Sequence, residues 1–406
     1  MKKISAKTLK GFRDFLPDEA GLREQLIEKI KEGFRLFGFE PLETPALEYA
    51  DVLLGKYGEE ADKLIYLFKD RGGRLIGLRY DQTVPLARVI ANYQNIIKPL
   101  KRYQIQPVWR AENPQRGRFR EFIQCDIDII GEKSYLADGE TITCAIKTAQ
   151  NLGFKKIKML INDRQLFAGL DQKIILTIDK LEKIGEKKVI EEIQALGFSQ
   201  KESKNLLQEI KNEKPTENLK KIFSFLELSG FKKDIDFSFK PTLARGLEYY
   251  TSTIFELIDE DYKSGSLGGG GRYDKLISQF TNQELPAVGF SFGFDRLVDA
   301  FKKQKSFNVQ REKRVFIAYF NDTLSEVLKL AEKLRENNIS CEINLNPEKK
   351  LDKQLKYADK KEVNYVLILG EEEIKKQKIK LKIMKTGEQK EIDLNKIIDI
   401  LKKLLV

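Results

Sequence analysis

The spacing of hydrophobic residues changes along the chain and predicts a mixture of helices and strands. Over residues 20–37, leucine, isoleucine and phenylalanine recur at helical spacing, which predicts an amphipathic helix that ends at Gly38. Over residues 253–258 the pattern becomes apolar alternation, which is typical of a strand. A polar turn at residues 259–262 separates this run from a second one that approaches Gly268, so the whole stretch predicts a β-hairpin.

The second arm of this hairpin consists of consecutive glycines, 268–271, followed by an arginine and Tyr273. A run of glycines is often a flexible linker, but linkers are flanked by loose polar sequence, whereas strand-like and helix-like segments flank this one. Glycine inside a strand usually marks a place where something approaches the backbone closely. We therefore interpret the hairpin, with Arg245, Tyr249 and Tyr250 on its other arm, as the surface of a small-ligand site.

Two further apolar runs, 63–68 and 75–80, flank a turn that contains Asp-Arg-Gly-Gly and therefore predict a second hairpin. Asp81 and Thr83 follow this hairpin, directly before a predicted helix. An acid and a hydroxyl in this position either hold the ammonium group of a ligand or cap the helix, and the local sequence favours capping.

An arginine-rich loop joins the predicted strands 101–108 and 122–131. Its arginines are Arg110, Arg116, Arg118 and Arg120. The guanidinium group suits bidentate contacts with phosphate, and Phe119 and Phe122 offer aromatic faces on which a base could stack. A solvated turn is the alternative interpretation of the same loop.

Gln124, Asp126 and Asp128 alternate along the second of these strands and so share one face. A buried core strand rarely tolerates such a polar stripe, which indicates that this face meets solvent or a ligand. Farther along, the glycine-spaced strand 287–294 leads into a helix whose first turn contains Arg296. A cation there opposes the helix dipole unless an anion binds nearby, and phosphate is the natural candidate.

The remaining patterns divide the chain into parts. Residues 170–231 are rich in lysine and glutamate, with leucine and isoleucine at helical spacing, which predicts a small helical insertion. After a polar stretch at 302–313, strands and helices alternate, which predicts a separate α/β domain with a mostly parallel sheet. A chain of 406 residues is long enough for two or three domains.

Composition narrows the class of protein. With 41% hydrophobic and 33% charged residues, and no apolar run that could form a membrane span or signal peptide, the sequence predicts a globular cytoplasmic protein. The net charge of +11 is compatible with a phosphate-rich partner such as RNA. Since Cys125, Cys144 and Cys341 are widely separated, we expect neither a disulfide framework nor a zinc site.

The chain contains no histidine. This excludes Ser-His-Asp hydrolysis, metal ligation by histidine and general-base catalysis by imidazole. Carboxylates, arginines, tyrosines, backbone groups and bound metal must carry any chemistry. Positioning and electrostatic stabilisation of phosphoryl chemistry fit that set of groups.

Taken together, these motifs resemble those of the class II aminoacyl-tRNA synthetases. The residues similar to the class motifs are Pro45 (motif 1), Arg110 and Glu112 (motif 2) and Arg296 (motif 3). The pair RGLEYY at 245–250 and GGGGRYD at 268–274 is similar to two signatures peculiar to the histidyl-tRNA synthetases. The resemblance covers nearly the whole chain.

This resemblance implies an α+β fold: a class II catalytic core with a mostly antiparallel sheet flanked by helices, a helical insertion and a C-terminal α/β anticodon-binding domain. The implied boundaries are 1–169 and 233–305 for the two parts of the core, 170–232 for the insertion and 314–406 for the anticodon-binding domain. A homodimer with the Pro45 strand near its interface is also implied.

The activity implied by the resemblance is that of a histidine–tRNA ligase. ATP would activate histidine to histidyl-adenylate with loss of pyrophosphate, Mg²⁺ would bridge the ATP phosphates, and the histidyl group would pass to the 3′ end of tRNA(His). Neither step needs a histidine of the enzyme. A metal ion bound by protein side chains and a membrane partner are not expected.

The resemblance also assigns roles to single residues. Those that would hold histidine are Asp81, Gln82, Thr83, Gln124, Asp128, Tyr249, Tyr250 and Tyr273. Asp81, Thr83 and Gln124 would bind the α-amino group, and Asp128 with the tyrosine pair would surround the imidazole.

Those that would bind ATP are Arg110, Glu112, Arg118, Phe122, Arg245 and Arg296. Phe122 would stack on adenine with Glu112 near the adenine amino edge, and Arg118 and Arg296 would take the distal phosphates. Arg110, Arg245 and Arg296 form the implied catalytic set. Arg110 and Arg245 would meet the α-phosphate, where Arg245 would stabilise charge that develops as the histidine carboxylate attacks.

Several features depart from the family pattern or fit other proteins. Gln82 and Ala111 replace residues more usual in the family, and Asn113 stands where many bacterial members place an arginine near the tRNA acceptor end. The main rival is the non-catalytic relative that regulates ATP phosphoribosyltransferase in histidine biosynthesis. That relative typically lacks the anticodon-binding domain and has eroded catalytic signatures, whereas both are retained here. A synthetase for another amino acid fits the two signatures poorly, and a pure RNA-binding protein leaves the polar stripe unexplained.

Overall fold

The computed structural model describes residues 4–115, 117–304 and 313–405, so Arg116 of the arginine-rich loop lies outside the described residues. The chain divides into two compact units, Met1–Phe307 and Asn308–Val406. Within the described ranges, no helix has both the length and the apolar character needed to cross a membrane.

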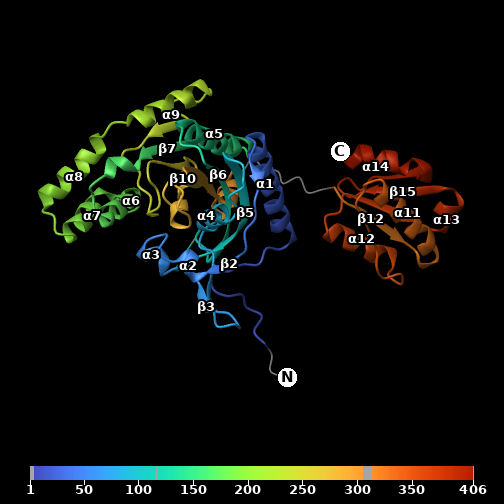
Figure 1. Ribbon diagram of the computed structural model, residues 1–406. Helices are drawn as coiled ribbons and strands as arrows, with labels where there is room; N and C mark the ends of the chain where they lie inside the picture. The colour runs from blue at the N-terminus through green and yellow to red at the C-terminus, as the bar shows by residue number, and fades with distance from the viewer. Residues whose placement is uncertain (1–3, 116, 305–312, 406) are drawn as a thin grey trace. The chain divides into compact units, whose positions relative to one another are not determined.

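A largely antiparallel sheet forms the centre of the first unit (Figure 1). Among the described residues its eight strands are, in spatial order, β1 (Glu40–Pro41), β5 (Leu100–Trp109), β6 (Glu121–Ile130), β11 (Ala287–Gly293), β10 (Gly268–Arg272), β9 (Thr253–Asp259), β7 (Ile157–Asp163) and β8 (Phe237–Phe239). The outer pairs β1–β5 and β7–β8 are parallel, and the strands between them are antiparallel. The mostly antiparallel core sheet is thus confirmed.

Long helices pack against this sheet. α1 (Pro17–Leu36) contacts both α5 (Tyr135–Asn151) and β5, and α5 contacts β11. The apolar face predicted for α1 is confirmed, because Leu26, Ile30 and Phe34 are fully buried. The helix begins earlier than predicted because Pro17, whose fixed φ suits the first helical turn, starts it.

Both predicted hairpins are present. β9 and β10 pair with Leu257 opposite Gly268 and Ile254 opposite Gly271. β3 (Leu67–Lys69) and β4 (Leu75–Leu78) also pair, and β2 (Leu47–Tyr49) adds a third strand to this small sheet. Five of its large apolar side chains are more than a third exposed: Leu47, Tyr49, Leu67, Phe68 and Leu75.

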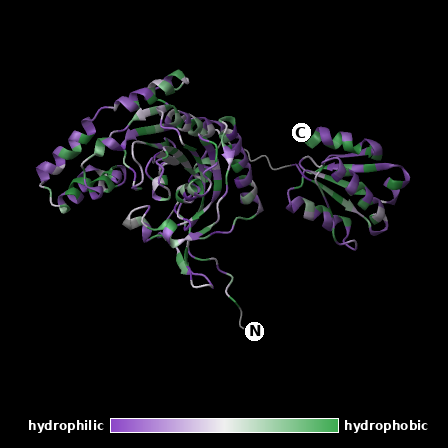
Figure 2. Cartoon of the chain, viewed as in Figure 1, coloured by the Kyte–Doolittle hydropathy of each residue, from purple (hydrophilic) through white to green (hydrophobic). Residues whose placement is uncertain are grey.

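The lysine- and glutamate-rich region is helical, as predicted. Its helices are α6 (Gln172–Asp179), α7 (Leu181–Ala195), α8 (Gln200–Asn212) and α9 (Glu217–Leu228). Hydrophilic and hydrophobic residues alternate along them in Figure 2, and their apolar faces bury Val189, Ile193 and Leu207 in a cluster of their own. α9 packs on α5, so this region is joined to the core of the first unit.

The second unit is an α/β domain. Its sheet has the strand order β13 (Cys341–Ile343), β12 (Val315–Tyr319), β14 (Tyr365–Leu369), β15 (Lys378–Ile383) and β16 (Gln389–Asp393). The first three strands are parallel, and β15 and β16 add an antiparallel hairpin. The accompanying helices are α11 (Leu324–Glu336), α12 (Leu351–Lys360), α13 (Glu371–Lys375) and α14 (Ile397–Leu405).

Candidate active site

A cavity of about 1490 Å³ is lined by residues from β6, β11, β10 and β9. Gln124, Asp126 and Asp128 all line it, because alternate residues of β6 face the same side. The interpretation of this polar stripe as a ligand-facing surface therefore agrees with the structure. Arg110, Arg245 and Arg296, which lie far apart in the sequence, line the same cavity.

The glycines around the cavity make room for neighbouring side chains. A Cβ added to Gly269 would clash with the guanidinium of Arg245, and one on Gly271 would lie 2.9 Å from Cδ1 of Tyr250. A Cβ on Gly289 of β11 would clash with the carboxylate of Asp128. The close approach predicted from the glycine run is confirmed, and the groups that make it belong to the chain itself.

Asp81 lies buried at the amino end of α4 (Thr83–Asn92), where it caps the helix and also lines the cavity. Its Oδ1 accepts hydrogen bonds from the backbone N–H groups of Thr83 and Val84, each at 3.1 Å, and so caps the helix. The hydroxyls of Tyr57 (3.0 Å) and Tyr249 (3.2 Å) donate to the same carboxylate, which lines the cavity. Burial raises the pKa of Asp81, although these hydrogen bonds oppose the rise.

Gln82 occupies a different place from its neighbours. Its amide Nε2 donates to the backbone carbonyl oxygens of Gln106 (2.8 Å) and Gln124 (3.3 Å). Gln82 is fully buried and ties the start of α4 to β5 and β6. These contacts make it a positioning residue beneath the cavity, whereas the sequence-based expectation placed it against histidine. Thr83 does line the cavity.

Asp128 is held by two side chains from neighbouring strands and loops. The hydroxyl of Tyr273 donates to its Oδ1, and Nη2 of Arg102 lies 2.7 Å from its Oδ2. Arg102 has no exposed surface, and Asp128 is 3% exposed. Burial raises the pKa of Asp128, while the nearby guanidinium acts in the opposite direction.

Sequence analysis did not identify Arg102. It faces Asp128 across the β5–β6 ladder, and Gln104 and Gln106 face Asp126 and Gln124 in the same way. β5 therefore carries a second alternating polar stripe, with the same period as the stripe that drew attention to β6. This alternation at every second residue is the sequence signal that could have identified Arg102.

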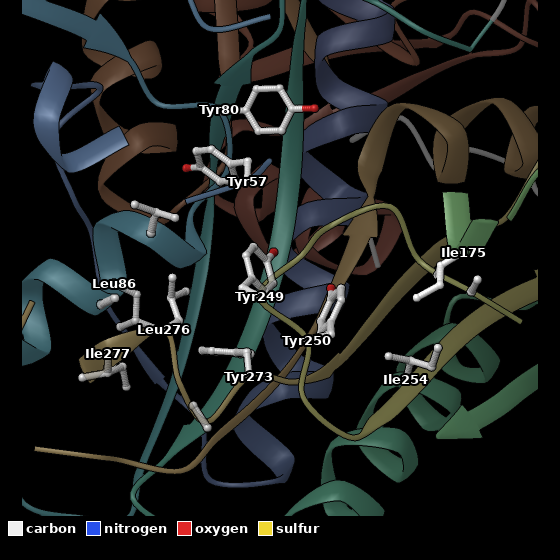
Figure 3. Close-up of a cluster of buried hydrophobic side chains, with 14 of the residues drawn as sticks. Tyr57, Tyr80, Leu86, Ile175, Tyr249, Tyr250, Ile254, Tyr273, Leu276 and Ile277 are labelled. Atoms are coloured by element: carbon white, nitrogen blue, oxygen red, sulfur yellow. The ribbon is translucent and has the colours of Figure 1, made fainter. Parts of the chain in front are cut away.

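Tyrosines form the apolar side of the cavity. Tyr249 lies with ring centroids 4.8 Å from Tyr250 and 5.9 Å from Tyr273, both in edge-to-face contact. These rings belong to one buried cluster together with Tyr57 and Tyr80 (Figure 3). Burial raises the pKa of Tyr249 and of Tyr273 well above the usual range, so their hydroxyls remain hydrogen-bond donors at neutral pH.

The opposite end of the cavity is basic. The guanidinium carbon of Arg110 lies 4.3 Å from the ring centroid of Tyr80 and 5.0 Å from that of Phe122, and its Nε donates to the Tyr80 carbonyl oxygen. Arg118 forms a 3.3 Å hydrogen bond with Glu112, which also lines the cavity.

Arg296 lies in the first turn of α10 (Phe294–Lys303), as predicted. Burial and the neighbouring cations Arg118 and Arg110 lower its pKa. Several positive charges close together at one partly buried place favour the binding of an anion there. Among the described residues, Nε of Arg245 is buried without a hydrogen-bond partner. This N–H group is therefore a further donor that could bind an anion.

A segment near the N-terminus supports this basic end, which the sequence did not reveal. Asp295 accepts hydrogen bonds from Arg13 (2.6 Å), Arg23 (2.8 Å) and the backbone N–H of Ile123 (3.2 Å). The Arg13 guanidinium also stacks on the ring of Phe119, 3.2 Å from its centroid. The chain itself thus covers one face of the Phe119 ring, which sequence analysis offered as a base-stacking surface, although Phe119 also lines the cavity.

Arg120 contributes to loop structure rather than to the basic end. Its Nε donates to the Glu112 carbonyl oxygen at 3.0 Å, and its backbone N–H donates to the Gly11 carbonyl oxygen at the same distance. These bonds fix the arginine-rich loop to the N-terminal segment.

The cavity thus combines two chemically different ends. Carboxylates and tyrosine hydroxyls at one end suit a cationic ligand with several N–H donors, and arginines at the other suit phosphates. Over residues 4–115, 117–304 and 313–405, no group of three or more cysteine, aspartate or glutamate side chains is arranged to hold a metal ion.

Comparisons with known proteins agree with this geometry. Residues 11–297 match the histidyl-tRNA synthetase family, and residues 314–404 match the anticodon-binding domain. The chain is 38% identical to the histidine–tRNA ligase of Christiangramia forsetii, covering 97% of this chain and 98% of the relative. It is 36% identical to the same enzyme of Clostridium tetani, covering 99% and 100%.

Solved structures show the same fold. The histidyl-tRNA synthetase of Nostoc superposes with a TM-score of 0.83 at 28% identity, covering 99% of this chain and 100% of that one. A protein of Bacillus halodurans described as an ATP phosphoribosyltransferase regulatory subunit/histidyl-tRNA synthetase gives a TM-score of 0.72 at 24% identity, which shows a shared fold alone. The sequence matches over nearly the full length show that the chain belongs to the histidyl-tRNA synthetase family.

Proposed function

We propose that the chain is a histidine–tRNA ligase that activates histidine with ATP and transfers it to the 3′ end of tRNA(His). The observation that carries this proposal is that one cavity holds both the carboxylate stripe of β6 and the three arginines. A cationic amino acid at the first end and ATP phosphates at the second would bring the histidine carboxylate to the α-phosphorus.

In the activation step, a carboxylate oxygen of histidine attacks the α-phosphorus of ATP, and the bond to pyrophosphate breaks. Asp81, Thr83 and Gln124 hold the α-ammonium, and Asp128, Tyr249 and Tyr250 enclose the imidazole with Tyr273. Arg110 and Arg245 bind the α-phosphate, and Arg245 stabilises the charge that grows there in the transition state.

Arg118 and Arg296 hold the departing phosphates, and Phe122 and Glu112 hold adenine. Mg²⁺ bound by ATP would neutralise phosphate charge, and the carboxylate of Glu256 at the cavity wall is a suitable oxygen ligand for it.

The remaining parts of the chain serve the second substrate and assembly. Residues 1–169 and 233–305 form the catalytic core, 170–232 an insertion, and 314–406 bind the anticodon. We propose a homodimer that covers the exposed apolar side chains of the β2–β4–β3 sheet, because such a patch favours a protein partner. Because the proposed substrate is a tRNA, we expect the activity in the cytoplasm.

The test is exchange of labelled pyrophosphate into ATP with each standard amino acid in turn. Histidine alone should support exchange, and Arg245→Ala should reduce its rate roughly 100-fold or more. Arg335→Ala, which removes an exposed arginine of the second unit, is the matched control and should exchange like the wild type. If no amino acid supports exchange, the proposal is wrong and the non-catalytic regulatory relative becomes the better description.

A further inference from the structure

We propose that Arg164 is a positioning residue for histidine activation, because it fixes the backbone of Arg245 to the first helix of the insertion. This inference rests on the proposed function and deepens it, since it names what places the charge of Arg245 at the α-phosphate. Sequence analysis assigned no chemical role to Arg164 or to the insertion.

The first observation concerns the segment 240–252, which connects β8 to β9 and carries Arg245 outside the strands. The backbone N–H of its first residue donates to the carbonyl oxygen of Ile161 at 2.9 Å. The carbonyl oxygen of its last residue accepts from the backbone N–H of Arg164, also at 2.9 Å. Both ends of the segment are therefore tied to the end of β7.

Side chains at the end of β7 also hold carbonyl groups inside this segment. Nδ2 of Asn162, which is fully buried, donates to the carbonyl oxygens of Pro241 and Leu243, each at 2.9 Å. Nη1 of Arg164 donates to the carbonyl oxygen of Arg245 at 3.3 Å. Side chains two positions apart thus bind carbonyl groups two positions apart, and Arg164 makes the bond at Arg245 itself.

The same guanidinium group holds the insertion. Nη2 of Arg164 donates to Oε1 of Gln172 at 2.8 Å, and Gln172 is the first residue of α6. A planar guanidinium carries its N–H donors in a fixed arrangement, so it keeps two acceptors at a set separation. Arg164 is therefore a bridge between the backbone of Arg245 and the insertion.

The middle of α6 packs on the segment that carries Arg245. Ile175 is buried in the same cluster as Tyr250 (Figure 3). Leu176 lies against the backbone next to Arg245, because a Cβ added to Gly246 would be 3.6 Å from its Cδ2. A shift of α6 would therefore shift this segment as well.

The far end of α6 reaches the cavity. Asp179 is the last residue of the helix and lines the cavity together with Arg245. Burial raises the pKa of Asp179, while the charges of Lys183 and Arg245 act in the opposite direction. The helix thus starts at a bridge to the backbone of Arg245 and ends near the charge of its side chain. A misplacement of about 1 Å can lower a reaction rate roughly 100-fold, so the position of α6 matters for activation.

The experiment measures histidine-dependent pyrophosphate exchange by the full-length protein. Arg164→Met removes the donors and should lower kcat roughly 10- to 100-fold, with KM for histidine nearly unchanged. Arg164→Lys should recover part of the rate, because an ammonium group can still donate to the Arg245 carbonyl oxygen. Lys173→Met replaces an exposed cation of α6 and is the matched control, which should exchange like the wild type.

A double-mutant cycle separates positioning from general support of the fold. If Arg164 acts through Arg245, Arg164→Met should add little to the loss caused by Arg245→Ala, whereas independent damage would multiply the two losses. Gln172→Leu removes only the bond to α6. It should lower kcat by a smaller factor, and this loss should also disappear when Arg245 is already alanine.

The outcomes keep the two proposals apart. Wild-type kcat in Arg164→Met, or losses that multiply in the cycle, would refute the positioning role. Absence of histidine-dependent exchange by the wild type would overturn the proposed function and this inference with it. An unchanged midpoint of thermal unfolding shows that a variant is folded. If Arg164→Met fails this check, Gln172→Leu takes its place in the cycle, and wild-type kcat in that variant refutes the bridge.

Discussion

The guanidinium group of Arg245 occupies the space that a side chain on Gly269 would need. Arg245 reaches the cavity only because the residue at this position of β10 is a glycine, which has no side chain. Gly269→Ala should therefore displace Arg245 and reduce histidine-dependent pyrophosphate exchange by roughly 10²- to 10³-fold, comparable to loss of one charge-stabilising donor.

A matched glycine provides the control for this prediction. A Cβ added to Gly21 in α1 would have no neighbouring atom within 4 Å, so Gly21→Ala should fold and exchange normally. Wild-type exchange by Gly269→Ala would show that Arg245 tolerates displacement or is not needed.

Removal of Arg102 should destabilise the first unit. Arg102→Met would leave the Asp128 carboxylate buried without its ion-pair partner, which costs roughly 3–5 kcal/mol of the free energy of unfolding. Urea denaturation followed by circular dichroism measures this loss. Lys156→Ala, which removes an exposed ion pair with Asp261, should leave the free energy of unfolding nearly unchanged. Equal stability of the two variants would contradict the structural role given to Arg102.

Asp126 should make the stability of the protein depend on pH. Its carboxyl keeps a proton up to about pH 7 in the folded state, whereas an unfolded aspartate loses it near pH 4. Between these values the folded state binds more protons, so this contribution is full at low pH and is lost as pH rises through 7. Relative to Asp126→Asn, the wild type should lose on the order of 4 kcal/mol between pH 4 and 8.

Urea denaturation of both proteins across this range provides the measurement. Because the chain contains no histidine, imidazole groups cannot contribute to the difference. Asp81 and Asp128 also have raised pKa values, but they are present in both proteins. Parallel stability curves would show that Asp126 does not titrate in this range.

The small β2–β4–β3 sheet should control assembly. Phe68 is 45% exposed on β3, and Phe68→Glu would place a charge in the proposed dimer contact. Sedimentation velocity should then detect monomers where the wild type forms dimers. Leu228→Glu changes an 87% exposed leucine in the helical insertion and should leave the dimer intact. A monomeric wild type would refute the assembly proposal directly.

The parts of the site that sequence predicted are those with local patterns. The stripe on β6 repeats at every second residue, and the glycines of β10 adjoin recognisable strand and helix segments, so neither required knowledge of the fold. The α1 helix and both hairpins were predictable for the same reason, because their hydrophobic periods lie within short windows.

The parts that sequence missed depend on distant contacts. Arg13 and Asp295 are 282 positions apart, and nothing near either residue indicates the other. Tyr57 lies in a short connection, and its hydroxyl is recognised as part of the site only through its hydrogen bond to the Asp81 carboxylate. The family resemblance assigned Gln82 to histidine, but its backbone partners on β5 and β6 are brought near only by the folded sheet.

Because carboxylates, tyrosines and arginines build the cavity and the chain contains no histidine, a bound histidine can be observed spectroscopically. Since no side chain of this protein carries an imidazole, bound histidine would contribute the sole imidazole of the complex. Nitrogen-15 NMR of isotope-labelled histidine on unlabelled protein would then report the tautomer and charge of the ligand ring without background. The ionisation of the acid beside that ring could be followed through the ligand itself, with no change to the protein.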